Sequence, residues 1–183
     1  YNRLLSNPVY YSRKVGYFLQ ILDFQPLVLD GKGNKRPPSE FKILNFATET
    51  QAKSALCCLN SNLFFWFITV FSDCRHVNKR EVDNLPVDLD ILAAGEIGSK
   101  LVSISKRLMD DIQKNSKLSR MTFSHDTLTI QTIYPKQSKG IIDSIDKLLA
   151  DYYGLSEVEY DFIVNYEVKY RMGQDFGEED NEE

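Results

Sequence analysis

The order of apolar and polar residues predicts strands in the first part of the chain. Residues 15–24, 27–29 and 41–47 are rich in β-branched and aromatic side chains, so each is expected to form a strand. Residues 30–39 separate the last two with glycines, an asparagine and paired prolines, a composition typical of a loop. We therefore expect a mixed β-sheet in this part of the chain.

A capping box marks the start of the first predicted helix. Thr48 offers a hydroxyl to a free backbone N–H, and Gln51, three residues on, reaches back to the backbone of Thr48. The helix is expected to run from residue 49 to about residue 71. Its last eight residues are mostly aromatic and β-branched, a composition that strands also have.

Helical periodicity dominates the second half of the chain. Apolar residues recur at spacings of three and four over residues 97–112 and again over residues 141–152. Residues 128–134 lie between them and alternate like a short strand. Gly154 follows the second helical stretch at the position where glycine commonly ends a helix.

The predicted elements suggest how the chain is organised. A further capping box at residues 156–159 opens a last helix, which is expected to run to about Tyr170. A strand-rich part followed by a helical part predicts the α+β class, with helices packed on the sheet. We divide the chain into a recognition domain (residues 1–88), a helical region with one short strand (89–173) and an acidic, disordered tail (174–183).

Composition excludes several classes of protein. With 43% hydrophobic and 12% aromatic residues, the 183-residue chain is able to bury a hydrophobic core, which excludes an intrinsically disordered protein. The longest apolar run, residues 63–71, is shorter than the roughly 20 residues needed to cross a membrane, so no membrane partner is expected. Three cysteines form no disulfide framework and favour a cytoplasmic location. The chain begins at Tyr1 without an apolar leader, so we expect it to be part of a longer polypeptide.

Charge is distributed unevenly along the chain. Residues 1–80 contain eleven Lys and Arg against five Asp and Glu, a balance of +6. Residues 175–183 contain six acids and no base. A basic segment in a chain whose net charge is −4 is typical of a protein that binds a polyanion, and an unevenly charged but merely solvated surface is the alternative.

Two short motifs are weak signals of chemistry. Residues 7–10, Asn-Pro-Val-Tyr, nearly match the Asn-Pro-Pro-Tyr motif of amino-methyltransferases, but the second proline is missing and only six residues precede the motif. We interpret these residues as a turn that leads into the first strand. Gly31 and Gly33 form a lone Gly-x-Gly without a following helix, which indicates a turn between strands rather than a cofactor loop.

A metal-dependent nuclease is an alternative that the sequence leaves open. Asp30, Glu40 and Lys42 fit the Asp…Glu-x-Lys pattern, in which carboxylates hold Mg²⁺ and the lysine lies by the attacking water. Cys74 and His76 lack a second pair of ligands, so no zinc site is predicted. A helical module that docks a protein partner is the other alternative, and its binding would be insensitive to salt and DNA.

Basic residues interleaved with aromatic and small polar residues are the strongest candidates for a binding surface. Arginine reads guanine bidentately, asparagine reads adenine, and lysine holds phosphates. Within the candidates, Arg36 and Arg75 are predicted to read bases, and Lys79 and Arg80 to clamp phosphates. The twelve candidates form three clusters: Tyr10, Tyr11, Arg13 and Lys14; Lys32, Lys35 and Arg36; and Arg75, His76, Asn78, Lys79 and Arg80.

Taken in order, these segments resemble a known family. The tyrosine-rich stretch and basic loop are followed by a helix with Leu-Asn-Ser at residues 59–61, then by residues 75–80, and then by Asn-Leu-Pro at residues 84–86. This order is similar to that of the TaqI-like C-terminal specificity domain, the target-recognition domain of adenine-specific DNA methyltransferases. Type I specificity subunits share the Leu-Asn-Ser helix and the closing Leu-Pro.

The second half of the chain strengthens the resemblance. Residues 138–146, 149–154, 162–166 and 169–173 are similar to the C-terminal end of type IIG-like restriction–modification proteins. In that family a methyltransferase domain precedes this region, so the resemblance implies two partners, double-stranded DNA and that domain. It also implies a chain that is non-catalytic by itself and holds no cofactor, because S-adenosylmethionine belongs to the parent protein. The parent is then a site-specific adenine methyltransferase, and some such proteins are also endonucleases.

Overall fold

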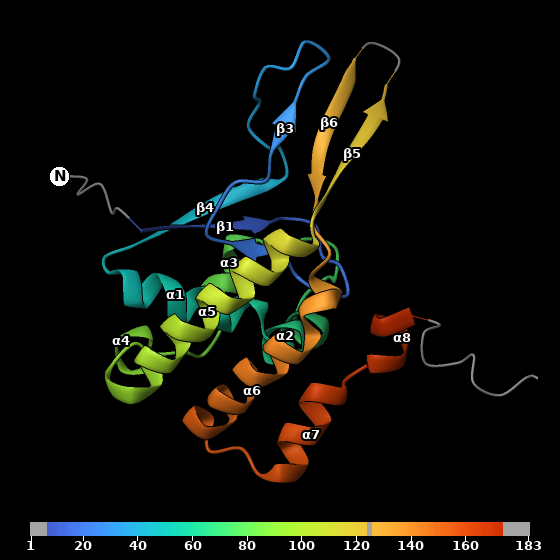
Figure 1. Ribbon diagram of the computed structural model, residues 1–183. Helices are drawn as coiled ribbons and strands as arrows, with labels where there is room; N and C mark the ends of the chain where they lie inside the picture. Colours follow the sequence, from blue (N-terminus) through green and yellow to red (C-terminus); the bar gives the residue numbers. More distant parts are fainter. Residues whose placement is uncertain (1–6, 124–125, 174–183) are drawn as a thin grey trace, which may run out of the picture.

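The structure is a computed structural model that describes residues 7–123 and 126–173 (Figure 1). The strands are β1 (Asn7–Ser12), β2 (Ile21–Leu22), β3 (Val28–Leu29), β4 (Phe41–Phe46), β5 (Lys117–Thr122) and β6 (Thr127–Thr132). The helices are α1 (Glu49–Asn60), α2 (Asn62–Phe71), α3 (Lys79–Asp83), α4 (Leu89–Leu92), α5 (Gly95–Asn115), α6 (Lys139–Tyr153), α7 (Glu157–Asn165) and α8 (Val168–Met172), with a short 3-10 helix η1 (Pro135–Ser138). The predicted α+β class is confirmed, whereas the mixed sheet is instead two antiparallel sheets.

The first sheet has the order β2-β1-β4 and packs against α1. Its central strand is β1, which pairs with β4 from Asn7 opposite Phe46 to Ser12 opposite Phe41. Residues 7–10 were predicted to be a turn, and this prediction is wrong because β4 supplies the backbone partners that extend them. The strand predicted at residues 15–24 is also wrong for most of its length, since only Ile21–Leu22 pair with β1.

The second sheet has the order β3-β6-β5 and stands out above the helices in Figure 1. Strand β3 pairs with β6 from Val28 opposite Ile130 to Leu29 opposite Thr129, which joins the two halves of the chain. The strands predicted at residues 27–29 and 128–134 are confirmed within a few residues. Strand β5 was not predicted, because its polar sequence carries no β signal of its own. We call this sheet, with the described residues at its tip (30–36, 123 and 126), the arm.

The first predicted helix is present but interrupted. The capping box is confirmed, since Thr48 Oγ1 accepts from the Gln51 backbone N–H at 3.1 Å and Gln51 Oε1 accepts from the Thr48 N–H at 3.1 Å. At Ser61 the chain leaves helical geometry, and the Ser61 hydroxyl caps α2 by accepting from the Phe64 N–H at 3.0 Å. No single helix within residues 7–123 and 126–173 is long and apolar enough to cross a membrane; α1 and α2 pass that test only as a pair, and they are bent by 62°.

The helices of the second half follow the predicted pattern with one break. Helices α5 and α6 cover the predicted apolar stretches, and Gly154 ends α6 in the left-handed conformation with φ of 67°. The last helix was expected to be continuous to about Tyr170, but it divides into α7 and α8 at Tyr166 and Glu167. Glu167 adopts a positive φ of 51°, which is incompatible with a continuous helix.

One hydrophobic core spans both halves of the chain. Leu22 and Leu56 from the first half are fully buried with Leu101 and Ile145 from the second half. The core therefore continues across residue 88, where the division into two domains was predicted, and that division stays a prediction. The predicted acidic tail, residues 174–183, lies outside the described residues.

Candidate nucleic-acid interface

The first and third basic clusters are joined by backbone pairing. Lys14 and His76 form an antiparallel bridge beyond the end of β1. On either side of it, the Val77 N–H donates to the Arg13 carbonyl at 2.8 Å, and the Val15 N–H donates to the Arg75 carbonyl at 3.3 Å. Residues separated by about sixty positions in the sequence therefore lie side by side. We call residues 13–15 together with residues 75–77 the basic ladder.

The loop that carries Arg75 and His76 is held in shape by an acidic side chain. Asp73 Oδ1 accepts from the backbone N–H of Arg75 at 3.0 Å and from that of His76 at 3.4 Å. The hydrogen bond from the Arg75 N–H is the main reason that the pKa of Asp73 is lowered. Because this carboxylate binds backbone donors, the Arg75 and His76 side chains extend from the loop and are exposed.

The second basic cluster lies on the arm and continues into the basic ladder. Lys32 and Lys35 belong to the hairpin that follows β3, where Leu29 and Lys35 form a bridge. From that hairpin the chain returns to the first sheet, where the Arg13 N–H donates to the Glu40 carbonyl at 2.9 Å. The three clusters therefore lie on separate stretches of the chain that are linked by backbone hydrogen bonds.

One candidate is removed by the structure. Tyr11 was predicted to contact DNA, but only 2% of the residue is exposed, because its side chain points from β1 into the core. Burial is also the main reason that its pKa is raised. Tyr10, its neighbour on the strand, is half-buried and keeps part of its surface accessible.

The charged candidates divide into paired and unpaired groups. Arg36 lies 3.1 Å from Asp126 and 3.6 Å from Asp30, so its guanidinium links the two loops at the tip of the arm. Lys79 pairs with Asp83, and Arg80 pairs with Glu81 at 2.8 Å. Five of the candidate cations have no acidic group within 4 Å in the part of the chain that the structure describes: Arg13, Lys14, Lys32, Lys35 and Arg75.

The third cluster ends on the short helix α3, whose start is braced by a buried carboxylate. Glu81 is 4% exposed, and its Oε2 accepts from the Asn78 backbone N–H at 2.9 Å. Burial opposes ionisation of this group, but hydrogen bonds from Arg80 and the backbone outweigh it and lower its pKa. Asn78 therefore caps the helix, and its side-chain amide donates to the His76 carbonyl at 3.4 Å.

One of the two carboxylates of the nuclease alternative, that of Asp30, holds a loop. Asp30 Oδ1 accepts from the backbone N–H of Lys32 and of Asn34, both at 2.9 Å. Hydrogen bonds from Asn34 are the main reason that the pKa of Asp30 is lowered. Lys42 lies on β4 opposite Tyr11. Over residues 7–123 and 126–173, no group of three or more His, Cys, Asp or Glu side chains is arranged to hold a metal ion.

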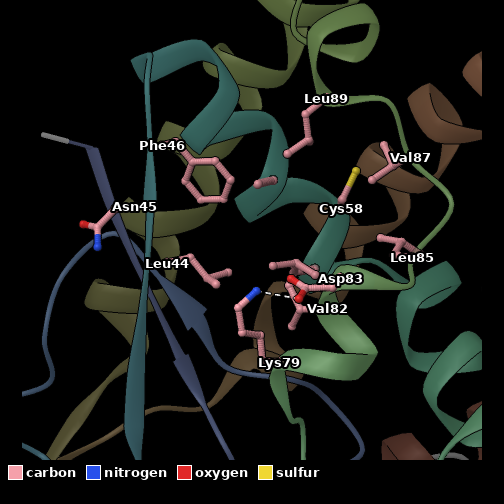
Figure 2. Close-up of a pocket in the computed structure, with 12 residues that line it drawn as sticks. Leu44, Asn45, Phe46, Cys58, Lys79, Val82, Asp83, Leu85, Val87 and Leu89 are labelled. Carbon is pink, nitrogen blue, oxygen red and sulfur yellow. Dashed lines mark hydrogen bonds and ion pairs between the residues drawn. The ribbon is translucent and has the colours of Figure 1, made fainter. Parts of the chain in front are cut away.

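A hollow of about 330 Å³ opens beside α3 and was not foreseen from the sequence (Figure 2). Its walls come from β4, α1, α3 and residues 85–89, and they are mostly apolar. Figure 2 shows the Lys79–Asp83 ion pair at one side of the hollow, and Asn45 is a further polar residue of its wall. Cys58 lies deeper, and burial raises the pKa of its thiol to about 12, so it is protonated and unreactive near neutral pH.

The described surface offers positive charge without acidic partners. The basic ladder and the arm present exposed cations, while the acids near them hold turns, cap a helix or pair with arginines. Comparison of the chain with family models, with curated proteins and with solved structures finds no match. The arrangement of the side chains is therefore what bears on function.

Proposed function

We propose that this chain is a sequence-specific duplex-DNA recognition domain of a bacterial, cytoplasmic restriction–modification adenine methyltransferase. It is non-catalytic by itself and uses no cofactor of its own. Its task is to hold the duplex so that a methyltransferase domain, which binds S-adenosylmethionine, reaches the target adenine once that base is turned out of the helix. The partners are double-stranded DNA and that catalytic domain.

The observation that carries the proposal is the basic ladder. Pairing of residues 13–15 with residues 75–77 brings the backbone segments that carry Arg13, Lys14 and Arg75 side by side, with Lys14 on the same face as His76 and with Arg13 and Arg75 on the other face. None of the three cations has an acidic partner among the described residues. Lys14 and Arg75 are exposed, whereas Arg13 is half-buried and its Nε atom is enclosed. Exposed cations without acidic partners on adjacent segments suit the phosphates of a duplex, because each neutralised phosphate releases a counterion. Lys14 then holds the backbone, and Arg75, with its planar fork, is the better base reader.

The other candidates take supporting roles in this proposal. Lys79 and Arg80 remain the proposed phosphate clamps, and each would exchange its present acidic partner for a phosphate. Tyr10 keeps enough exposed surface to pack against a sugar or base. His76 and Asn78 lie beside Arg75 and complete the same stretch of surface.

Salt dependence of duplex binding tests the proposal. Four to six phosphate contacts give a slope of log K against log salt of about −4 to −5. Fluorescence anisotropy with a labelled duplex at several salt concentrations measures it. Lys14→Ala should weaken binding to every duplex sequence alike and reduce the slope by about 1. Lys147→Ala is the matched control, because it removes the same charge from α6, where Lys147 pairs with Glu157 at 3.1 Å.

Two results would contradict the proposal. A flat salt dependence, or an equal loss in the Lys14 and Lys147 variants, would mean that the basic ladder does not contact DNA. Binding of a protein partner that neither salt nor added DNA weakens would instead favour the protein-interaction module. Mg²⁺-dependent cleavage of DNA that is lost in Glu40→Ala would favour the nuclease.

A further inference from the structure

The arm has two faces of different character. In an antiparallel sheet, residues opposite each other share a face, and the faces alternate along each strand. Val28 and Ser119 both lie opposite Ile130, and Met121 lies opposite Leu128, so these residues form one face. This apolar face borders a hollow of about 440 Å³, whose other wall includes the prolines at positions 37 and 38.

The opposite face of the arm carries a positive charge and is more polar, although Leu29 and the exposed Leu118 also lie on it. Arg120 lies opposite Thr129, and Thr122 lies opposite Thr127, so all four share a face. None of the four side chains makes a hydrogen bond or an ion pair with another described residue. We call Arg120, Thr122, Thr127 and Thr129 the polar face of the arm.

The arm as a whole is positively charged even though it contains two acids. Residues 27–36 and 117–132 contain five Lys and Arg and two Asp. Both aspartates, Asp30 and Asp126, pair with the same cation, Arg36. Lys32, Lys35 and Arg120 are therefore left to attract a polyanion, while Lys117 lies on the opposite face of β5 from Arg120.

At the tip of the arm, the hairpin that contains Asp30 and Arg36 is linked to Asp126, which precedes β6. Arg36 reaches an aspartate in each loop, and the Phe123 N–H donates to the Asp126 carbonyl at 2.8 Å. At Gly31 a Cβ would lie 3.3 Å from Asp126 Oδ1 and 3.4 Å from the Thr127 carbonyl, so the absence of a side chain permits this close approach. Arg36, predicted from the sequence to read a base, has its guanidinium engaged in this link.

We infer that the arm enters the major groove of duplex DNA and that its polar face contacts the bases, with Arg120 as a specificity-determining residue in addition to Arg75. This inference rests on the proposed function. A strand of six residues, such as β5, is about 20 Å long, and the major groove is about 12 Å wide and admits a two-stranded β-ribbon. Strands β5 and β6 form such a ribbon, because β3 pairs with only two residues of β6.

The residue types of the polar face suit base edges. The unpaired guanidinium of Arg120 is able to bind the O6 and N7 atoms of guanine with two hydrogen bonds. The threonines supply hydroxyls that donate or accept, and methyl groups that pack against the thymine methyl. Lys32 and Lys35, in the neighbouring hairpin, are placed for the phosphates on the groove edge.

A selection from a pool of duplexes with a randomised centre tests the inference on the full chain. The wild type should enrich one sequence, and Arg120→Ala should bind that sequence about 5- to 150-fold more weakly, with preference lost at one base pair. Arg120→Lys should not restore the preference, because lysine lacks the planar fork. Lys117→Ala is the matched control on the same strand but the other face, and it should keep the preference.

A second pair of variants tests the face itself. Thr129→Glu places a negative charge on the polar face and should abolish binding of the selected duplex. Thr132→Glu, on the same strand and the opposite face, places its carboxylate opposite Lys117 and should retain binding. Thermal melting followed by circular dichroism confirms that each variant is folded.

The outcomes separate this inference from the proposed function. If the wild type binds DNA and Lys14→Ala weakens it, but Arg120→Ala and Thr129→Glu bind and select as the wild type does, the arm does not read bases and the domain-level proposal stands. If the wild type binds no duplex at low salt, the inference about the arm and the proposed function are both overturned. If Arg120→Ala loses the preference at one base pair and Lys117→Ala keeps it, the result supports the inference about the arm and the proposed function.

Discussion

Asp146 lies 2% exposed where α6 meets the start of α2, and replacing it with asparagine should change how stability depends on pH. Its carboxylate accepts from the backbone N–H of Asn62 at 3.2 Å, from the Asn62 side-chain amide at 2.6 Å and from the Leu63 N–H at 3.1 Å. Burial raises the pKa of Asp146 to about 7, and the nearby Asp143 adds to the rise, whereas the bonds from Asn62 and Leu63 oppose it.

The sign of the effect follows from this raised pKa. An unfolded aspartate titrates near 3.8, so between that value and about 7 the folded state binds a proton that the unfolded state has lost. This contribution to stability is complete below the unfolded pKa and is lost as the pH rises through 7. Each pH unit between 5 and 7 is worth about 1.4 kcal/mol, or about 2.7 kcal/mol over the interval.

Urea unfolding of wild type and Asp146→Asn from pH 5 to pH 8 measures this contribution. The asparagine does not titrate, so the free energy of unfolding of the wild type should fall by about 2.7 kcal/mol more than that of the variant. The carboxylates with lowered pKa values, such as Asp30 and Asp73, titrate below this range and affect both proteins equally. Parallel pH profiles for the two proteins would refute the reasoning.

Three other predictions concern the function and the local structure. The chain alone should not bind S-adenosylmethionine, since residues 7–10 lie in β1 rather than in a catalytic loop, and micromolar binding in calorimetry would contradict this. Removal of residues 174–183, where the acids concentrate, should not weaken duplex binding measured by anisotropy at low salt, because these acids oppose a polyanion. Thr48→Ala should lower the free energy of unfolding in urea by about 1 kcal/mol, since the cap of α1 is lost, and an unchanged midpoint would argue against the cap.

Features set by neighbouring residues were predictable from the sequence. The capping box of Thr48 and Gln51 and the glycine after α6 act within a few residues, and both have the predicted geometry. The break at Ser61 was missed because the surrounding residues favour a helix, while Ser61 caps α2 and its neighbour Asn62 binds a distant carboxylate on α6.

Features that depend on distant partners were not predictable in the same way. Residues 7–12 form a strand because β4 pairs with them, and β5 forms because β6 does. The three clusters were recognised by composition, but the pairing of Lys14 with His76 and the burial of Tyr11 arise from tertiary contacts. The polar face of the arm was missed because Arg120 lies on β5, a strand that the hydrophobic pattern of the sequence does not predict.

The pairing of β3 with β6 has a consequence for engineering. The arm draws on two stretches of chain about one hundred positions apart, and the Leu27 carbonyl accepts from the Gln131 N–H at 2.8 Å at their junction. A chimera that exchanges only residues 27–36 would combine strands whose side chains had not been selected to pack together. Transfer of one protein's arm to another therefore requires both segments at once, grafted as a discontinuous unit.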